Sequence, residues 1–136
     1  MDKAQLETLK TRALALWKRH GRETPVPGLF VASADVPTGP IHGVYRPSVC
    51  IVLQGTKISQ LGGQAYRYEE GNCLITSLEV PIRAHILDAS AHAPYVAFVL
   101  DIEPAVVSEL LVELARGEPI AAAGPAAMSV HPLANG

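Results

Sequence analysis

The sequence predicts a mainly β chain, a jelly-roll or barrel with one helix near each end. Two observations lead to this fold class. Eight or so short apolar runs follow one another, each bounded by glycine, proline or other turn residues, which is the spacing of a sandwich or barrel. Apolar side chains recur at the three- and four-residue spacing of a helix near the two ends, in residues 2–20 and 103–115.

The first helix is expected in residues 2–20, within an N-terminal segment 1–23. Its apolar stripe continues to Trp17, with charged residues elsewhere on the helical wheel, and Gly21 is a suitable stop. Trp17 is the single tryptophan, and a large aromatic side chain most often buries its area within its own domain. We therefore expect Trp17 to dock this helix on the barrel.

The clearest strand-turn-strand pattern lies in residues 48–68. Residues 49–53 form a continuous apolar run rich in β-branched side chains, which favours a strand buried on both faces, and Gln54-Gly55 ends it. Residues 57–61 and 64–68 alternate between polar and apolar, and Gly62-Gly63 between them can supply the positive φ angles of a tight turn. These residues predict a hairpin with one solvated face.

The remaining strands are short apolar runs between turn residues. The barrel, residues 24–101, is expected to add strands at 29–32, 41–45, 73–76, 82–87 and 95–100. Cys50 and Cys73 each lie inside such a run, so we interpret them as small core hydrophobes.

The second helix is expected within residues 102–117. Pro104 suits its first turn, and Arg116-Gly117 suits its end. Its stripe is wider than one packed seam needs, which predicts a homodimer interface formed by Val107, Leu110, Leu111 and Leu114. The alternative is that the barrel covers the whole stripe and the chain is a monomer. Residues 118–136, rich in Ala, Gly and Pro, show no periodicity and are expected to be a linker or tail.

Composition and charge narrow the class of protein. The chain has 136 residues, 49% hydrophobic and 18% charged, as in a globular domain with a core. No apolar run approaches the ~20 residues of a membrane helix, and the N-terminus lacks an apolar signal core, so we expect no membrane partner and a cytoplasmic location. Residues 2–23 carry six basic and three acidic side chains, a charge of +3. The net charge of −2 leaves −5 for the rest, which disfavours DNA as a partner of the barrel itself.

A resemblance to a known family rests on several consecutive motifs. Arg46-Pro47-Ser48 is followed by the apolar run to Leu53, by Gln54-Gly55-Thr56-Lys57, by the glycine-turn hairpin, and by Tyr68-Glu69-Glu70-Gly71-Asn72 and Val80-Pro81. From about residue 27 to 115 the chain resembles the N-terminal domain of AraC-type transcription regulators. The resemblance implies a cupin-like barrel that senses a small molecule or mediates dimerisation, normally followed by a DNA-binding pair of helix-turn-helix units. Those units are not found in this sequence.

The cupin fold often holds a metal, through a His-x-His pair, a glutamate and a later histidine. Here His42 supplies one member of the pair, Val49 or Cys50 stands near the place of the glutamate, and His85 is spaced too far along. A divalent metal needs three or four converging donors, so we expect no metal and no other cofactor. The sequence also contains no nucleophile elbow and no thiol in an activating context, and we name no catalytic residue.

A ligand pocket remains as the candidate site. If the position that matches the cupin glutamate faces inward, alternation places Ser48, Cys50, Val52 and Gln54 inside, with His85 across from them and His42 nearby. The same set is typical of a filled barrel core. Gln54 has a second interpretation, in which its amide satisfies a backbone group at the break before Gly55.

Together these features predict the effector-sensing and dimerisation domain of an AraC-type regulator, not an enzyme. Its expected partners are a small-molecule effector and a second copy of the chain, with DNA contacted through a helix-turn-helix domain outside this sequence. Two alternatives stay open. One is a stand-alone small cupin enzyme, and the other is a protein-interaction module whose barrel interior is packed shut.

Overall fold

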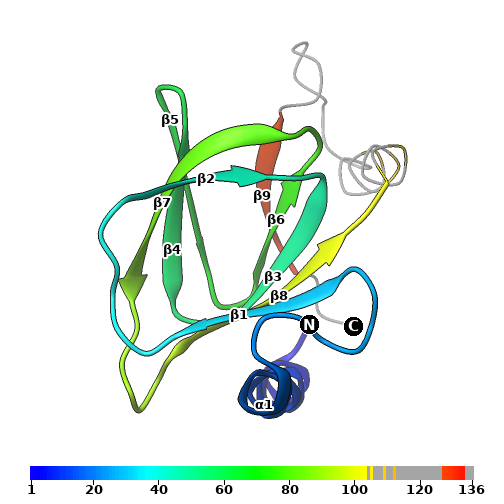
Figure 1. Ribbon diagram of the computed structural model, residues 1–136, viewed down its shortest axis with the longest axis vertical. Coiled ribbons are helices and arrows are strands. Elements are labelled where there is room, and N and C mark those ends of the chain that lie inside the picture. Colours follow the sequence, from blue (N-terminus) through cyan, green and yellow to red (C-terminus); the bar gives the residue numbers. More distant parts are fainter. Residues whose placement is uncertain (104, 106–108, 110–111, 113–126, 134–136) are drawn as a thin grey trace.

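The computed structural model describes residues 1–103, 105, 109, 112 and 127–133 (Figure 1). Its first element is the helix α1 (Lys3–His20), which strands follow. The strands are β1 (Leu29–Ala34), β2 (Ile41–Tyr45), β3 (Ser48–Gln54), β4 (Thr56–Leu61), β5 (Gln64–Glu69), β6 (Asn72–Thr76), β7 (Val80–Asp88), β8 (Tyr95–Asp101) and β9 (Met128–Pro132). The mainly β prediction is confirmed, and each predicted strand is present with bounds within two residues of those expected.

The strand pairing is that of a jelly roll. β1 pairs with β8, β2 with β7, β3 with β6 and β4 with β5, all antiparallel, as in a long hairpin folded over on itself. The result is two sheets, β1-β8-β3-β6-β9 and β2-β7-β4-β5, which face each other (Figure 1). No ladder in the described part of the chain joins them, so the cupin-like fold is an open sandwich and not a closed barrel.

Helix α1 begins with a reciprocal cap. The Asp2 side chain accepts from the backbone N–H of Gln5, and the Gln5 side chain accepts from the backbone N–H of Asp2. The helix ends at Gly21, which has a φ of 74° and donates its N–H to the carbonyl of Trp17.

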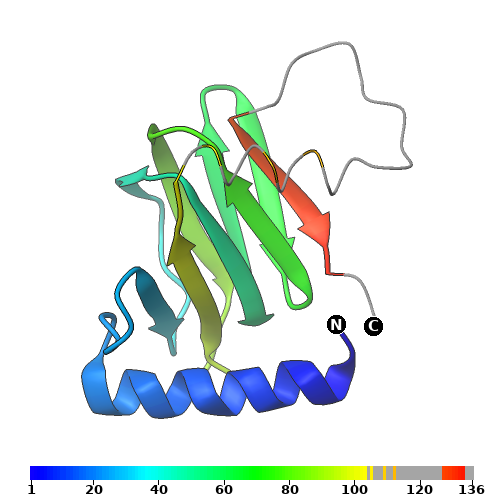
Figure 2. The ribbon, with the colours of Figure 1, turned by 90° about the vertical axis from the view of Figure 1, so that its right-hand side faces the viewer.

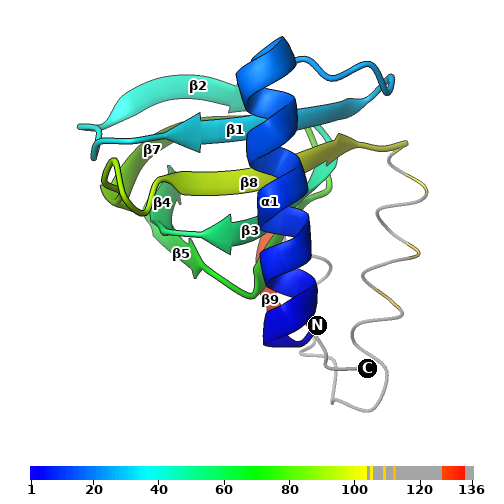
Figure 3. The same ribbon diagram turned by 90° about the horizontal axis from the view of Figure 1, so that it is seen from below.

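The helix crosses the outer face of the larger sheet, over β1, β8 and β3 (Figures 2 and 3). Ala13 is fully buried there against Val31 and Leu53. Leu6, Leu9, Leu14 and Leu16 pack around the same cluster. Trp17 does not belong to it and keeps 37% of its area exposed, so our expectation that Trp17 docks the helix is wrong. Consecutive helical residues point about 100° apart, and the docked stripe passes through Leu16 instead.

The β4–β5 hairpin turns through Gly62-Gly63, since Leu61 pairs with Gln64. Gly62 takes a φ of 60°, whereas Gly63 has no positive φ. One positive φ at the first central residue is the pattern of a type II′ turn, so only one of the two glycines has the predicted conformation.

Strand β9 corrects the expectation of a linker or tail for residues 128–132. It pairs antiparallel with β6, from Asn72 opposite Pro132 to Thr76 opposite Met128. Met128 is fully buried between the sheets. Five residues beside an Ala-, Gly- and Pro-rich stretch are too few to show a clear period in the sequence. The strand forms because it pairs with β6 at the edge of the larger sheet.

The helix expected in residues 102–117 lies largely outside the described residues, and so do the dimer candidates Val107, Leu110, Leu111 and Leu114. Of that stretch, Ala105, Glu109 and Val112 are helical and exposed. Among the described residues, no helix is both long enough and apolar enough to cross a membrane.

Candidate ligand cavity

A cavity of about 110 Å³ lies between the two sheets, at the end of the sandwich where β2 passes into β3. On the larger sheet, three polar residues lie side by side at the start of the cavity wall, because Ser48 of β3 is opposite both Asp101 of β8 and Thr76 of β6. The next inward row is less polar and consists of Val99, Cys50 and Leu74. The cavity is further lined by Arg22, Ala32, Val44, Tyr45, Arg46, Lys57, Tyr68 and Tyr95.

Three hydroxyl groups on the smaller sheet form hydrogen bonds with one another. The Tyr45 hydroxyl lies 2.9 Å from Ser59 Oγ and 3.0 Å from the Tyr68 hydroxyl, and the last two lie 2.6 Å apart. Burial raises the pKa of the Tyr68 phenol well above its usual value, and Tyr45 acts in the same direction. The Tyr68 phenol is therefore neutral at physiological pH, and the hydroxyl network holds the Tyr45 and Tyr68 rings, which both line the cavity, in place.

Lys57 points into the sandwich. Because side chains alternate between the two faces of a strand, Lys57 shares a face with Ser59 and Leu61. Ser59 is fully buried, and Leu61 packs on the core between the sheets. Its Nζ lies 5.6 Å from the centre of the Tyr45 ring and 5.8 Å from that of Tyr95, within cation–π range. The two rings belong to opposite sheets, so the ammonium lies between the sheets.

Thr76 has a buried hydroxyl without a hydrogen-bond partner in the described structure. The residue is 1% exposed and lines the cavity. A buried hydroxyl left unpaired costs about 1–3 kcal/mol of folding free energy. A guest in the cavity could supply the missing partner, because a hydroxyl can both donate and accept.

The charged groups at the cavity are mostly positive. Arg46 forms an ion pair with Asp101 and keeps 62% of its side chain exposed, which places this pair at the solvent end. Arg22 lies over the Phe30 ring at 5.3 Å. Three cations and one carboxylate line the cavity, a formal charge of +2 in a chain whose net charge is −2.

Only some of the predicted site residues line this cavity. Ser48 and Cys50 do, and Val52 belongs to the packed core beneath it. His42 and His85 do not, because Ile82, Ala84 and Ile86 are the inward residues of β7. Alternation then places His85 on the outer face beside Ile58, and His42, opposite Arg83, faces outward too. The prediction that His85 faces Cys50 is therefore wrong.

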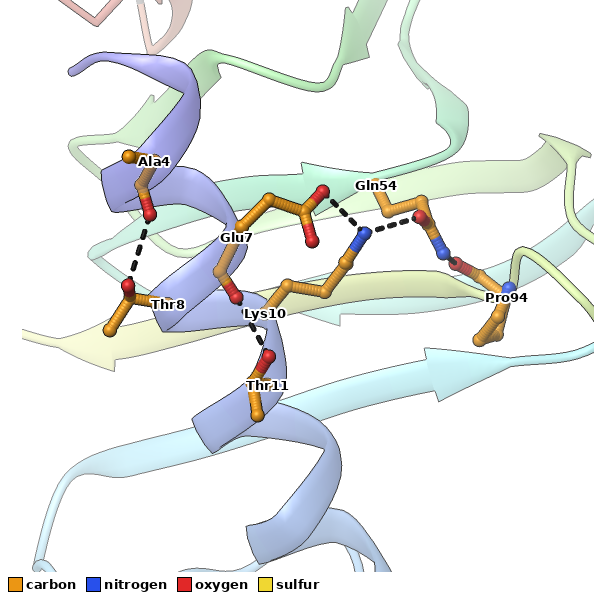
Figure 4. Close-up of polar contacts among 7 residues, drawn as sticks. All are labelled: Ala4, Glu7, Thr8, Lys10, Thr11, Gln54 and Pro94. Carbon is orange, nitrogen blue, oxygen red and sulfur yellow. Dashed lines mark hydrogen bonds and ion pairs between the residues drawn. The ribbon is translucent and has the colours of Figure 1, made fainter.

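Gln54 lies on the helix side of the sheet, because a register shift between Val52 and Gln54 interrupts the alternation of β3 (Figure 4). Its Nε2 donates to the carbonyl of Pro94 at 2.8 Å, and its Oε1 accepts from Lys10 Nζ at 2.9 Å. Lys10 also pairs with Glu7. This geometry agrees with the second interpretation of Gln54, in which its amide satisfies a backbone group. It does not agree with the interpretation that places Gln54 inside the barrel.

The strongest features of the cavity, Lys57 and Thr76, were not among the candidate site residues. Lys57 belongs to the hairpin that is predicted to have one solvated face, and its spacing of four residues from Leu61 indicates that both side chains lie on the same side of the strand. Thr76 carried no signal of its own. Its position follows from pairing with Ser48, which the sequence does not show.

The thiol at the cavity is not a ready nucleophile. Burial raises the pKa of Cys50 to about 11, although nearby Lys57 acts in the opposite direction, so the thiol is protonated at neutral pH. Burial also raises the pKa of Cys73. Within the described ranges, no three His, Cys, Asp or Glu side chains are grouped as a metal site would require.

Two comparisons with known proteins bear on this geometry. A family model described as AraC-type transcriptional regulator N-terminus matches residues 25–136, more than half of the chain. This range exceeds the one expected from the motifs, because it extends through β9. A search of curated proteins finds no match.

Proposed function

The chain belongs to the family of AraC-type transcriptional regulator N-terminal domains, and we propose that it is the effector-sensing and dimerisation part of such a regulator. The observation that carries the sensing proposal is the Thr76 hydroxyl, which is buried without a described partner at a cavity between the two sheets. Small-molecule sites combine an apolar wall with a few polar groups, as this cavity does. In this proposal the domain acts by binding and not by catalysis, and it works in the cytoplasm beside the DNA that the regulator controls.

DNA contact is assigned in this proposal to a helix-turn-helix domain of the regulator. The body of the present domain after residue 23 carries a charge of −5, so the electrostatic term that dominates non-specific DNA affinity is repulsive.

Ligand-dependent stability tests the sensing proposal. We expect at least one compound in a library of small metabolites to raise the thermal unfolding midpoint by several degrees, because a ligand at 100 times its Kd adds about 2.7 kcal/mol. The variant Cys50→Leu places extra carbon atoms in the cavity and should fold but lose this response. Cys50→Ala, which keeps the cavity open, is the matched control and should retain it. The sensing proposal fails if no compound stabilises the chain, or if Cys50→Leu responds as the unchanged chain does.

Self-association tests the dimerisation proposal, which rests on the apolar spacing of Val107, Leu110, Leu111 and Leu114. Sedimentation should show a dimer at tens of micromolar, and Leu111→Glu or Leu114→Glu should give a folded monomer. Full burial of each leucine contributes about 2 kcal/mol, which is sufficient for a two-fold seam of this kind. Exposed Val112 is the control position, where Val112→Glu should leave the dimer intact. If the unsubstituted chain sediments as a monomer, the dimerisation proposal fails. It also fails if the leucine variants unfold, because that result would place Leu111 and Leu114 in the core of the domain.

A further inference from the structure

We propose that the cavity binds a small organic anion, a monocarboxylate of about three or four carbon atoms, through the Lys57 ammonium and the Thr76 hydroxyl. The inference rests on the proposed sensing function and specifies the chemical class of the effector. Both groups line the same cavity, and each lacks the partner that a carboxylate oxygen provides.

The Lys57 ammonium is a charge of the cavity lining that has no described carboxylate partner. No described carboxylate lies within 4.0 Å of it, and it forms no hydrogen bond with another described residue. Asp101, the lining carboxylate, is already paired with Arg46. The Tyr45 and Tyr95 rings stabilise the positive charge, but a ring face leaves the three N–H donors of an ammonium without strong acceptors.

The surroundings strengthen the attraction for an anion. The cavity lies between two sheets, where the effective dielectric constant is lower than in water and each charge acts more strongly. Arg22 and Arg46 add positive charge to the wall, so the lining remains at +2 after Asp101 is counted. A neutral or cationic guest would leave that charge uncompensated, whereas a monoanion compensates half of it.

The volume limits the size of the guest. An apolar cavity of about 150 Å³ holds benzene, which has six carbon atoms. A cavity of about 110 Å³ therefore accommodates about four to six non-hydrogen atoms. The hydroxyl and ammonium fit the carboxylate end of such a molecule, and Leu74, Val99 and Ala32 form an apolar wall for its short alkyl end. These features together favour a short-chain monocarboxylate.

The test compares propionate with propionamide, its neutral counterpart of the same shape, by calorimetry and amide NMR at matched ionic strength. We expect propionate to bind with a dissociation constant on the order of a millimolar or below, which a ligand of about five non-hydrogen atoms can reach. Propionamide should bind at least about tenfold more weakly, because hydrogen bonds to charged groups are the stronger ones. Inorganic phosphate, an anion without an alkyl end, should bind more weakly than propionate.

Three variants localise the effect. Lys57→Met keeps the length of the side chain and removes the charge, and it should weaken propionate binding at least about tenfold. Thr76→Val keeps the shape and removes the hydroxyl, and it should weaken binding several-fold. Lys18→Met removes the same charge from an exposed position on α1 and should change nothing. Thr76→Val gives an independent test if Lys57→Met does not fold.

The outcomes separate the class of effector from the sensing function. If propionamide binds as well as propionate, or if Lys57→Met binds propionate unchanged, the anion inference is overturned while a cavity that senses a neutral effector stands. If no carboxylate binds but a neutral metabolite stabilises the chain, the same conclusion follows. If neither carboxylates nor any library compound binds, the sensing function fails together with the inference.

Discussion

Gly55→Ala is expected to lower the free energy of unfolding by about 2–5 kcal/mol, as the sum of backbone strain and overpacking. Gly55 has a φ of 91°, which residues with a side chain rarely adopt. A Cβ there would lie 2.7 Å from the carbonyl oxygen of Asp88 and 2.9 Å from Tyr95 Cα. Both are backbone atoms, so relief would require strands β7 and β8 to move, and β8 carries part of the cavity wall.

Urea unfolding measures this loss, and Gly62→Ala is the matched control. Gly62 also has a positive φ, 60°, but a Cβ there meets nothing within 4 Å. Gly62→Ala should therefore lower the free energy of unfolding only by the cost of backbone strain, about 1–2 kcal/mol. Equal losses for the two variants would contradict the close approach of β7 and β8 to Gly55.

Leu53→Ala is expected to cost about 2–5 kcal/mol of stability, the usual range for truncating a buried leucine. Leu53 is 1% exposed and packs with Ala13, Val31 and Phe98 in the cluster beneath α1. The truncation leaves a space between the helix and the larger sheet. Because the neighbouring Gln54 joins Lys10 of α1 to Pro94, loosening the helix should also increase amide hydrogen exchange around Gln54.

Thermal and urea unfolding of Leu78→Ala provide the comparison, because Leu78 is 59% exposed and its truncation should cost no more than about 0.5 kcal/mol. A small loss for Leu53→Ala, similar to that of the control, would mean that α1 does not dock on the sheet as described here.

The strands could be predicted from sequence because each one buries a face and is bounded by turn residues. The run at residues 49–53 and the alternation at 64–68 are local signals, and the structure has β3 and β5 there. β9 could not be predicted in the same way, since its burial depends on its pairing with β6. The C-terminal dimer candidates lie outside the described residues and stay a prediction.

The site was harder to predict than the fold because the inward or outward direction of a side chain depends on register. A single irregularity in β3 moved Gln54 from the expected interior to the α1 side of the sheet. A lysine is normally expected at the surface, yet Lys57 enters the sandwich between two tyrosine rings. In the Gln54-Gly55-Thr56-Lys57 motif, the glutamine thus connects the helix, the glycine permits a close backbone approach, and the lysine reaches the cavity.

The most direct test of an effector site between the sheets is an amide NMR spectrum of the isotope-labelled chain. It would be recorded with and without the compound that raises the unfolding midpoint most. An effector in the cavity predicts that the largest shift changes fall on Ser48, Cys50, Lys57 and Thr76, with little change at His42 or His85. Changes confined to α1 or to the outer face of β2-β7-β4-β5, with the cavity residues unmoved, would contradict it.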